Sequence, residues 1–377
     1  MRKIGVEEEL MLVNPDTGEL AAVSSKALRA HEELAQEEGS DHDEDLVDQE
    51  AFLQQIETAT KPCTELGELG AEIVRGRRAA GRAAREAGAV AVAVPTPVLT
   101  REEGQVTPKE RHQRILNEYG EMSRSSLVCG MHMHIDIHGE DEAVQVLDGI
   151  RPWLQVLLAI SANSPYWHGR DTSFASWRSQ VWGRWPSAGP AEPFENPAEY
   201  RKTLEKMVEW GAAVDEGMLY LDTRIAKAYP TIEIRVADVC TEVEDAVLIA
   251  SLARALVETA ATESDSRAWR SDLLRAASWR AARYGLAGTL VNPHTWELAP
   301  ARDVFEALRT HVEPALRDAG DWEWTGEAFD RLMSQGTGAA RQRSAFEVSG
   351  SVDGVVRDLI DRTERSWAGE EQGRVAS

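Results

Sequence analysis

The stretch Gly5–Val13 places several carboxylates directly beside an apolar run, since it reads Gly-Val-Glu-Glu-Glu-Leu-Met-Leu-Val. Successive residues of a strand point to opposite faces, so Glu7 and Glu9 are predicted to share one face. Two carboxylates about 5 Å apart repel each other by about 3 kcal/mol at an effective dielectric constant of about 20. Either one carboxylate keeps its proton or a cation lies between them, and a hard divalent ion such as Mg²⁺ is the usual solution. We therefore interpret Glu7 and Glu9 as the first wall of a metal site.

Other predicted strands carry chemically active residues on one face in the same way: His132 and His134 in 127–137, Glu233 and Arg235 in 231–236, and Glu57 in 46–60. A carboxylate two residues from a guanidinium is, taken alone, more often a structural ion pair. Strands that repeat the pattern predict instead one polar face of an antiparallel sheet, held together by metal and phosphate. Carboxylates, imidazoles and guanidinium groups suit nucleotide phosphate chemistry, in which Mg²⁺ bridges phosphate oxygens and Arg neutralises developing charge.

Composition narrows the class of protein. Hydrophobic residues make up 42% of the 377 residues, which is enough for a sizeable core. The formal net charge of −23 argues against nucleic acid as a partner, because a phosphate backbone would be repelled. The sequence contains neither a GxxxxGK[ST] phosphate loop nor a G-x-S-x-G nucleophile elbow. With three widely spaced cysteines and neither a leader nor a long apolar run, we expect a cytoplasmic protein that does not engage a membrane.

The elements that must position these residues fall into two parts. Predicted strands concentrate in residues 1–240, whereas residues 241–367 are nearly all helical, with helices over 243–262, 267–284, 300–318, 323–335 and 351–367. The tail, 368–377, is expected to be frayed. This order predicts an α+β fold rather than alternating βαβ units. Because no linker rich in Pro, Gly or Ser marks a boundary, we predict a single domain over 1–377.

A long irregular segment, 162–197, combines Trp and Arg residues. Long loops without regular structure are more often functional than incidental. We interpret this segment as a flap that orders over nucleotide and substrate and excludes water from a reactive intermediate.

Ordered motifs along the chain resemble those of the type 2 glutamate–cysteine ligase family of carboxylate–amine ligases. The motifs are Gly5-Val-Glu-Glu-Glu, Gln55-Ile-Glu-Thr-Ala-Thr, Gly130-Met-His-Met-His-Ile, Asn163-Ser-Pro-Tyr-Trp-His-Gly-Arg-Asp-Thr, Phe174-Ala-Ser-Trp-Arg, Trp185-Pro-Ser-Ala-Gly and Tyr229-Pro-Thr-Ile-Glu-Ile-Arg-Val-Ala-Asp-Val. Trp279-Arg-Ala-Ala-Arg-Tyr-Gly extends the resemblance beyond the strand-rich part. Motifs in this order are more specific than any one of them.

The resemblance implies a fold and a reaction. The family is similar to glutamine synthetase, with a curved antiparallel sheet whose concave face is the active site and whose other face is covered by helices. Its reaction is phosphorylation of a carboxylate by ATP, followed by attack of an amine on the acyl phosphate. With glutamate and cysteine the product is γ-glutamylcysteine, with ADP and phosphate. ATP and Mg²⁺, with Mn²⁺ as an alternative, are therefore the expected cofactors, and a homodimer is compatible with the family.

Carried over position by position, the resemblance assigns roles to individual residues. The implied metal ligands are Glu7, Glu9, Glu57, His134 and Glu233. The implied nucleotide contacts are His134, Arg178, Arg224 and Arg235, of which Arg178 and Arg235 are also the implied catalytic residues. His132 is expected only to orient its neighbour or to hydrogen-bond within the sheet.

Two departures from the family pattern concern the substrate. Arg224 is followed by Ile225-Ala226 where Pro-Ser is expected, and Asp136 stands where a small residue is usual. Two alternatives therefore stay open: a ligase that joins glutamate to a different amine, and a non-catalytic relative that binds nucleotide or metal. A degenerate site should lose at least one carboxylate, so the complete acid–His–Arg set counts against the second alternative. A phosphagen-kinase-type transferase is weaker still, because no guanidino-substrate site is recognisable.

Overall fold

The computed structural model describes residues 1–38, 46–99, 104–263 and 269–368 of the chain. Its centre is a seven-stranded sheet in which the strand order is β2-β3-β1-β5-β9-β8, with β4 also paired to β1. The strands are β1 (Ile4–Val13), β2 (Val47–Gln49), β3 (Gln55–Ala59), β4 (Val90–Val92), β5 (Gly130–Asp136), β8 (Thr223–Ile225) and β9 (Thr231–Asp238). Every pairing in the sheet is antiparallel. The prediction of a mixed helical and antiparallel fold is therefore confirmed.

The register of the sheet sets the polar side chains beside one another. The pairs across neighbouring strands are Glu9 with Glu57, Glu7 with His132, and His134 with Glu233. Side chains directly opposite each other on antiparallel strands lie about 5 Å apart on the same face. One face of β3, β1, β5 and β9 is therefore polar across four neighbouring strands, as the alternation in the sequence predicts.

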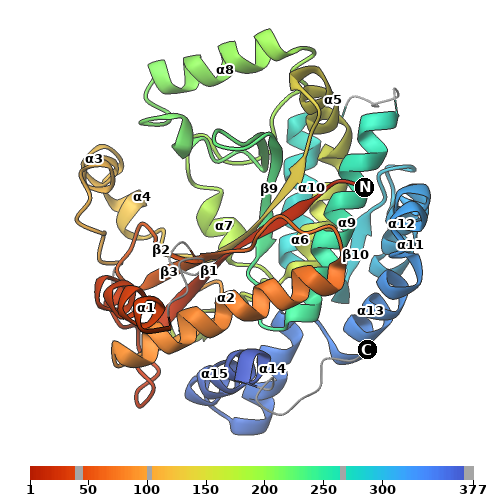
Figure 1. Ribbon diagram of the computed structural model, residues 1–377. Coiled ribbons are helices and arrows are strands. Elements are labelled where there is room, and N and C mark those ends of the chain that lie inside the picture. Colours follow the sequence, from red (N-terminus) through yellow and green to blue (C-terminus); the bar gives the residue numbers. More distant parts are fainter. Residues whose placement is uncertain (39–45, 100–103, 264–268, 369–377) are drawn as a thin grey trace.

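The opposite face of these strands is apolar and belongs to the main core. Its residues are at most 2% exposed: Val6, Met131, Met133, Ile135, Ile232 and Ile234. Helices α5 (Glu140–Ile150), α6 (Leu154–Ser161) and α9 (Val243–Thr262) pack against this side (Figure 1). The short 3₁₀ helix η2 (Arg151–Trp153) separates α5 from α6 at Pro152. The stretch Glu140–Ser161 is long and apolar enough to cross a membrane, but 78% of its apolar window is buried inside the protein.

Glu8 is the exception on the apolar face. It is 2% exposed and points toward α2 (Leu66–Glu86), where Arg77 donates from Nε and Nη2 to its two carboxylate oxygens at 2.8 and 2.6 Å. The same guanidinium donates to the carbonyl oxygens of Cys240 and Thr241 at 2.5 and 2.7 Å. This buried ion pair joins β1, α2 and the end of β9.

A second apolar cluster joins the later half of β1 (Leu10–Val13) to the last described helix. Helix α15 (Val352–Ala368) packs against α2 and β4, and α14 (Gly338–Ser349) packs against α15 (Figure 1). Helix α1 (Ser24–Glu38) lies along α2. The carboxyl-terminal helices thus complete the core under the amino-terminal strands.

The remaining elements surround this centre. They are α3 (Glu110–Tyr119), α4 (Glu121–Arg124), β6 (Tyr166–Trp167), β7 (Arg170–Asp171), α7 (Arg178–Trp182), α8 (Pro197–Glu209), η3 (Glu216–Met218), α10 (Ser271–Tyr284), η4 (Gly285–Ala287), β10 (Thr289–Val291), β11 (Leu298–Pro300), α11 (Ala301–His311), α12 (Glu313–Ala319) and α13 (Trp322–Gln335).

The helical part differs from the prediction in two places. The helix predicted over 300–318 is wrong as one element, because it breaks at Val312, just before Pro314 in the first turn of α12. Proline lacks the N–H that a continuous helix would need there. Helix α14 falls in a stretch for which no helix was predicted, since its apolar residues do not recur at helical spacing. The start of the helix predicted over 267–284 and the tail from residue 369 lie outside the described residues.

Candidate active site

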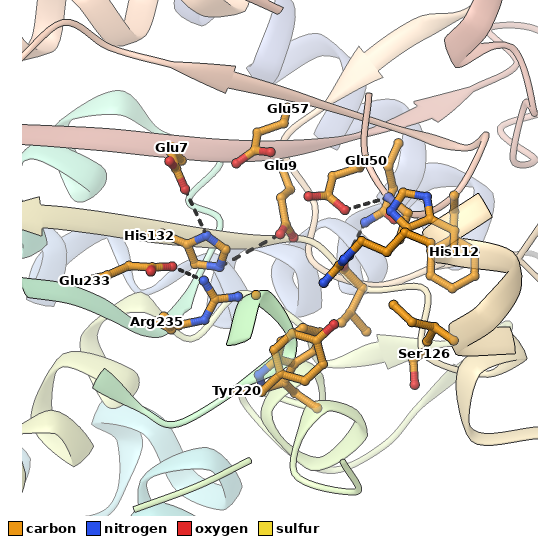
Figure 2. Close-up of a pocket in the computed structure, with 18 of the residues that line it drawn as sticks. Glu7, Glu9, Glu50, Glu57, His112, Ser126, His132, Tyr220, Glu233 and Arg235 are labelled. Carbon is orange, nitrogen blue, oxygen red and sulfur yellow. Dashed lines mark hydrogen bonds and ion pairs between the residues drawn. The ribbon is translucent and has the colours of Figure 1, made fainter. Parts of the chain in front are cut away.

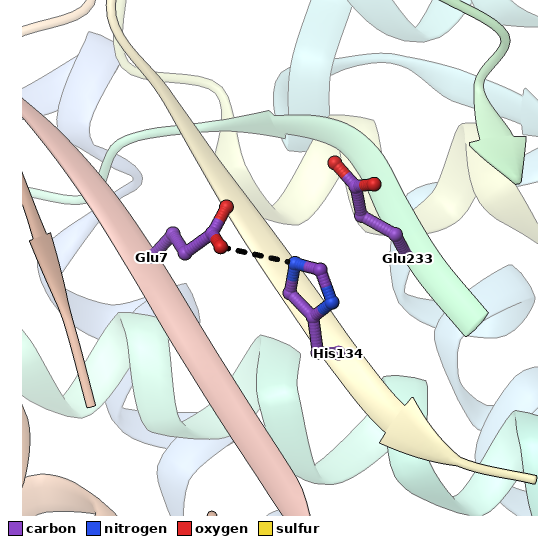
Figure 3. Close-up of side chains that lie close together, drawn as sticks. All are labelled: Glu7, His134 and Glu233. Carbon is purple, nitrogen blue, oxygen red and sulfur yellow. Dashed lines mark ion pairs between the residues drawn. The ribbon is translucent and has the colours of Figure 1, made fainter. Parts of the chain in front are cut away.

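Glu7 belongs to two clusters of metal-ligating side chains on the polar face. Glu7, His134 and Glu233 each offer one ligand atom, and these atoms lie within 4.8 Å of one another (Figure 3). Glu7, Glu57 and His132 form a second set by the same measure. Glu7 Oε1 lies 3.3 Å from His134 Nε2, and Glu7 Oε2 lies 3.3 Å from His132 Nδ1. One carboxylate on β1 therefore links residues from β3, β5 and β9.

The pKa values of these carboxylates show that burial and mutual repulsion oppose several negative charges at this site. Burial raises the pKa of Glu57 well above 4.5, and the charges of Glu50, Glu7 and Glu9 raise it further. Burial and the charge of Glu50 raise the pKa of Glu9 to about 7. Burial also raises the pKa of Glu7, but hydrogen bonds with His132 and His134 outweigh that effect and hold the pKa below 4.5. Without a cation, Glu57 and Glu9 tend to keep a proton beside the ionised Glu7, so a divalent ion could replace those protons.

The two histidines are placed as metal ligands usually are. His134 Nδ1 lies 3.0 Å from Thr231 Oγ1, a contact that fixes the orientation of the ring. Nε2 of His132 is buried and makes no hydrogen bond with a described residue, whereas Nε2 of His134 is directed at Glu7 Oε1, 3.3 Å away. Burial and the nearby charge of Arg235 lower the pKa of His132 to about 4, which leaves the imidazole neutral. The donor set of carboxylates and imidazoles fits Mg²⁺, and fits Mn²⁺ at least as well.

Glu233 is also held by two guanidinium groups. Arg224 Nε donates to Glu233 Oε2 at 2.6 Å, and Arg235 Nη1 donates to Glu233 Oε1. Burial raises the pKa of Glu233, but the charges of Arg235 and Arg224 outweigh it and lower the pKa to about 2. Arg235 is 7% exposed, and its Nε has no hydrogen-bond partner among the described residues. The Glu233 carboxylate thus brings the guanidinium groups of Arg224 and Arg235 together beside Glu7 and His134.

These residues line a cavity of about 410 Å³ (Figure 2). Of the predicted residues, the cavity is lined by Glu7, Glu9, Glu57, His134, Arg224, Glu233 and Arg235. Glu9 belongs to neither ligand set; its Oε2 accepts a hydrogen bond from the Gly130 amide at 2.6 Å. His132, which was expected only to support its neighbour, belongs to one of the ligand sets.

Arg178, the remaining implied nucleotide contact, lies beside Trp182, with its Cζ 5.8 Å from the ring centroid. It is not among the described residues that line the cavity, and it is 2% exposed. Its Nη2 lies 3.4 Å from the carbonyl oxygen of Arg235, and its guanidinium lies against Gly130 on the face of β5 that His132 and His134 share. The nucleotide contact that the resemblance implies for Arg178 stays a prediction.

Sequence reasoning missed the rest of the cavity wall, apart from Trp182 and Trp185 in the predicted flap. This wall consists mainly of Glu50, Phe52, Lys109, Arg111, His112, Ser126, Trp182, Trp185 and Tyr220. Most of these residues lie in loops or at helix ends, where no strand alternation marks them. The cluster of cations at 109–112, beside a predicted helix start, was the one signal that could have drawn attention to this wall.

Hydrogen bonds fix the beginning of the Trp-rich segment, 162–197, to β9. The buried carboxylate of Asp238 accepts hydrogen bonds from the Asn163 amide, Ser164 Oγ and Ser176 Oγ at 2.9, 2.7 and 2.9 Å. Of the tryptophans in this segment, Trp182 and Trp185 line the cavity.

The sequence matches one protein family over nearly its whole length. A model of the glutamate–cysteine ligase family 2 (GCS2) matches residues 3–362. A relative from Nocardioides sp., named as a candidate glutamate–cysteine ligase 2-1, is 47% identical over 374 residues, which cover 97% of each chain. A relative of the same name from Streptomyces avermitilis is 46% identical over 370 residues, covering 97% of this chain and 100% of the relative.

Solved structures share the fold at low sequence identity. A glutamate–cysteine ligase from Francisella tularensis in complex with AMP aligns with a TM-score of 0.63 at 12% identity, covering 100% of this chain and 95% of that one. A bifunctional glutathione synthetase from Pasteurella multocida aligns with a TM-score of 0.67 at 15% identity, covering 97% of this chain and 52% of that one. These likenesses concern the fold alone. The match of the family model and the close relatives show that the chain belongs to the glutamate–cysteine ligase family 2.

Proposed function

We propose that this protein is an ATP-dependent carboxylate–amine ligase that joins the side-chain carboxylate of glutamate to the amine of cysteine. The observation that carries the proposal is the cavity in which two ligand sets share Glu7 and adjoin Arg235. In a chain of this family, such a site can hold nucleotide phosphates on one polar face of the sheet. Glutamate–cysteine ligation agrees with the names of the relatives.

The proposed reaction has two steps. A carboxylate oxygen of glutamate attacks the γ-phosphorus of ATP, the bond to the β-phosphate oxygen breaks, and ADP leaves. The amine nitrogen of the acceptor then attacks the acyl carbon, phosphate leaves, and the nitrogen loses a proton. Phosphoryl transfer of this kind needs positioning and charge neutralisation more than a covalent residue.

Different residues of the cavity would bind the cations and the phosphate oxygens. Glu7, Glu57, Glu233, His132 and His134 would hold the divalent cations, which neutralise the phosphate oxygens of the nucleotide when bound. In the same cavity, the guanidinium groups of Arg235 and Arg224 are fixed by Glu233, so that both can donate to phosphate oxygens without reorganising.

A ligase with a different acceptor amine is the second candidate. Ala226 lines the main cavity, and Ile225 lines a neighbouring cavity of about 280 Å³ that shares Arg224 with it. Both residues depart from the family pattern, and both stand where an acceptor could approach Glu233. An ATP-dependent product screen by mass spectrometry, with glutamate and a panel of amines including cysteine, distinguishes the two candidates. If no amine gives a ligated product and no glutamate-dependent ADP forms, the ligase proposal fails.

Removing the metal is expected to abolish turnover. Excess EDTA should stop ATP consumption and added Mg²⁺ or Mn²⁺ should restore it, because the clustered carboxylates cannot bind nucleotide phosphates without a cation. Glu7→Gln should raise the metal concentration for half-maximal activity at least about tenfold, since Glu7 contributes to both ligand sets. Glu86→Gln, an exposed change on α2, is the matched control. Full turnover in EDTA would contradict the proposed metal dependence.

Binding of ATP with Mg²⁺ is expected to change tryptophan fluorescence. Trp182 and Trp185 line the cavity, and Trp182 lies 4.4 Å from Tyr220 between ring centroids. The change should be reduced in Trp182→Phe and retained in Trp279→Phe, since Trp279 is 47% exposed on α10. A response that survives in Trp182→Phe and disappears in Trp279→Phe would show that this part of the segment does not respond to nucleotide.

A further inference from the structure

Arg178 fills a space that the strand leaves open only because residue 130 is glycine. A Cβ at position 130 would lie 2.2 Å from Nη2, 2.8 Å from Cζ and 3.0 Å from Nε of Arg178. Real Cβ atoms do not approach other atoms this closely, so the guanidinium is in contact with the backbone of β5 at Gly130. The amide of Gly130 also donates a hydrogen bond to Glu9 Oε2, at 2.6 Å.

The same guanidinium reaches the neighbouring strand. Arg178 Nη2 lies 3.4 Å from the carbonyl oxygen of Arg235 on β9. Arg178 Cζ and Arg235 Cζ lie 5.8 and 5.9 Å from the ring centroid of Trp182. The Arg178 side chain therefore touches the backbone of Gly130, whose amide binds the Glu9 carboxylate. It also touches the backbone of Arg235.

A buried hydrogen-bond network holds Arg178 in this position. Its amide donates to Ser164 Oγ at 3.0 Å, and Ser164 Oγ in turn donates to Asp238 at 2.7 Å. Asp238 is fully buried on β9 and also accepts from Ser176 Oγ. The start of α7 is thus tied to the same strand that carries Arg235, so that Arg178 cannot shift without breaking contacts in a closely packed interior.

We propose that Arg178 is a positioning residue for the ligation, and that it acts from beside the cavity without touching nucleotide or substrate. It holds the Gly130 amide and the Arg235 carbonyl so that Glu9 and Arg235 keep their directions in the cavity. The inference rests on the proposed function, because it assigns to Arg178 a part in that reaction. It also gives a reason for glycine at position 130, which is the only residue without a Cβ.

Arg178→Lys tests the inference in the intact protein. Lysine keeps the charge but lacks the planar fork that contacts both strands. We expect kcat to fall at least about tenfold, as small misplacements of catalytic groups do, with KM for ATP and glutamate changed less than about twofold. The melting temperature should stay near that of the wild type. Arg184→Lys is the control, since Arg184 lies in the same segment and bonds the carbonyl of Ser125 outside the cavity.

The other outcomes each overturn the inference. A raised KM with unchanged kcat would mean that Arg178 touches substrate, and wild-type kinetics would mean that it has no role. A loss of activity that follows the folded fraction would make Arg178 purely structural. A wild-type protein without ligase activity would defeat the proposed function itself, which is a separate result.

A double-mutant cycle with Gly130→Ala tests the contact directly. Gly130→Ala should lower kcat because its methyl group collides with Arg178. In the Arg178→Ala background that space is free, so adding Gly130→Ala should change kcat less than about twofold. Additive losses would show that the two residues act independently and would overturn the inference. If Gly130→Ala does not fold, Arg178→Lys alone decides the question.

Discussion

Arg235→Lys is expected to lower kcat by a factor of about 10² to 10³ while leaving KM for ATP nearly unchanged. Arg235 lines the cavity, is 7% exposed, and is fixed by its ion pair with Glu233 (Figure 2). Phosphoryl transfer builds charge on the equatorial oxygens of the transferred group, where a preorganised guanidinium stabilises the transition state. Lysine keeps one charge but loses the fork, so it should not substitute.

The melting temperature of the same variant separates catalysis from structure. If Arg235 only partners Glu233, the variant should be less stable and its activity should follow the folded fraction. Arg362→Lys is a suitable control, because Arg362 lies on α15 and pairs with Asp358 of the same helix and with Glu242. A well-folded Arg235→Lys protein with wild-type kcat would remove Arg235 from the mechanism.

Arg77→Met is expected to be the most destabilising single change outside the cavity, at about 3–5 kcal/mol. Arg77 and Glu8 are 1% and 2% exposed, and the substitution leaves a buried carboxylate without its partner. It also leaves the carbonyl oxygens of Cys240 and Thr241 without their donor. Urea denaturation, compared at equal protein concentration, measures the change in the free energy of unfolding.

Two further variants test whether burial of the Arg77–Glu8 ion pair causes the loss of stability. Arg85→Met removes a more exposed ion pair from the same helix, with Glu364 at 2.7 Å, and should cost about 1 kcal/mol or less. Glu8→Leu combined with Arg77→Met removes both charges, so it should recover part of the loss. An Arg77→Met protein no less stable than Arg85→Met would contradict this account.

The amino-acid sequence by itself determined which residues share a face within each strand. The alternation along a strand has a period of two residues, so Glu7 with Glu9, His132 with His134, and Glu233 with Arg235 followed from local order alone. The antiparallel sheet and most helices were predicted for the same reason, since periodicity is a local property. Where that signal was weak, as in α14, the prediction failed.

The tertiary structure decided which residues of different strands meet. The register of β1 against β5 sets Glu7, rather than Glu9, opposite His132, and so made Glu7 the residue common to both ligand sets. Placing Glu9 opposite His132 would need a shift of two residues, which keeps the same faces, so the alternation within each strand does not specify that choice.

The tertiary structure also decided which residues support the polar face. Arg77 and Glu8 are 69 positions apart, and Arg178 reaches Gly130 from a segment without regular spacing. Such contacts depend on how helices close over the sheet, and a local pattern does not encode them. The types of residue at the site could therefore be read from the sequence, whereas the division between cavity residues and supporting residues required the packed structure.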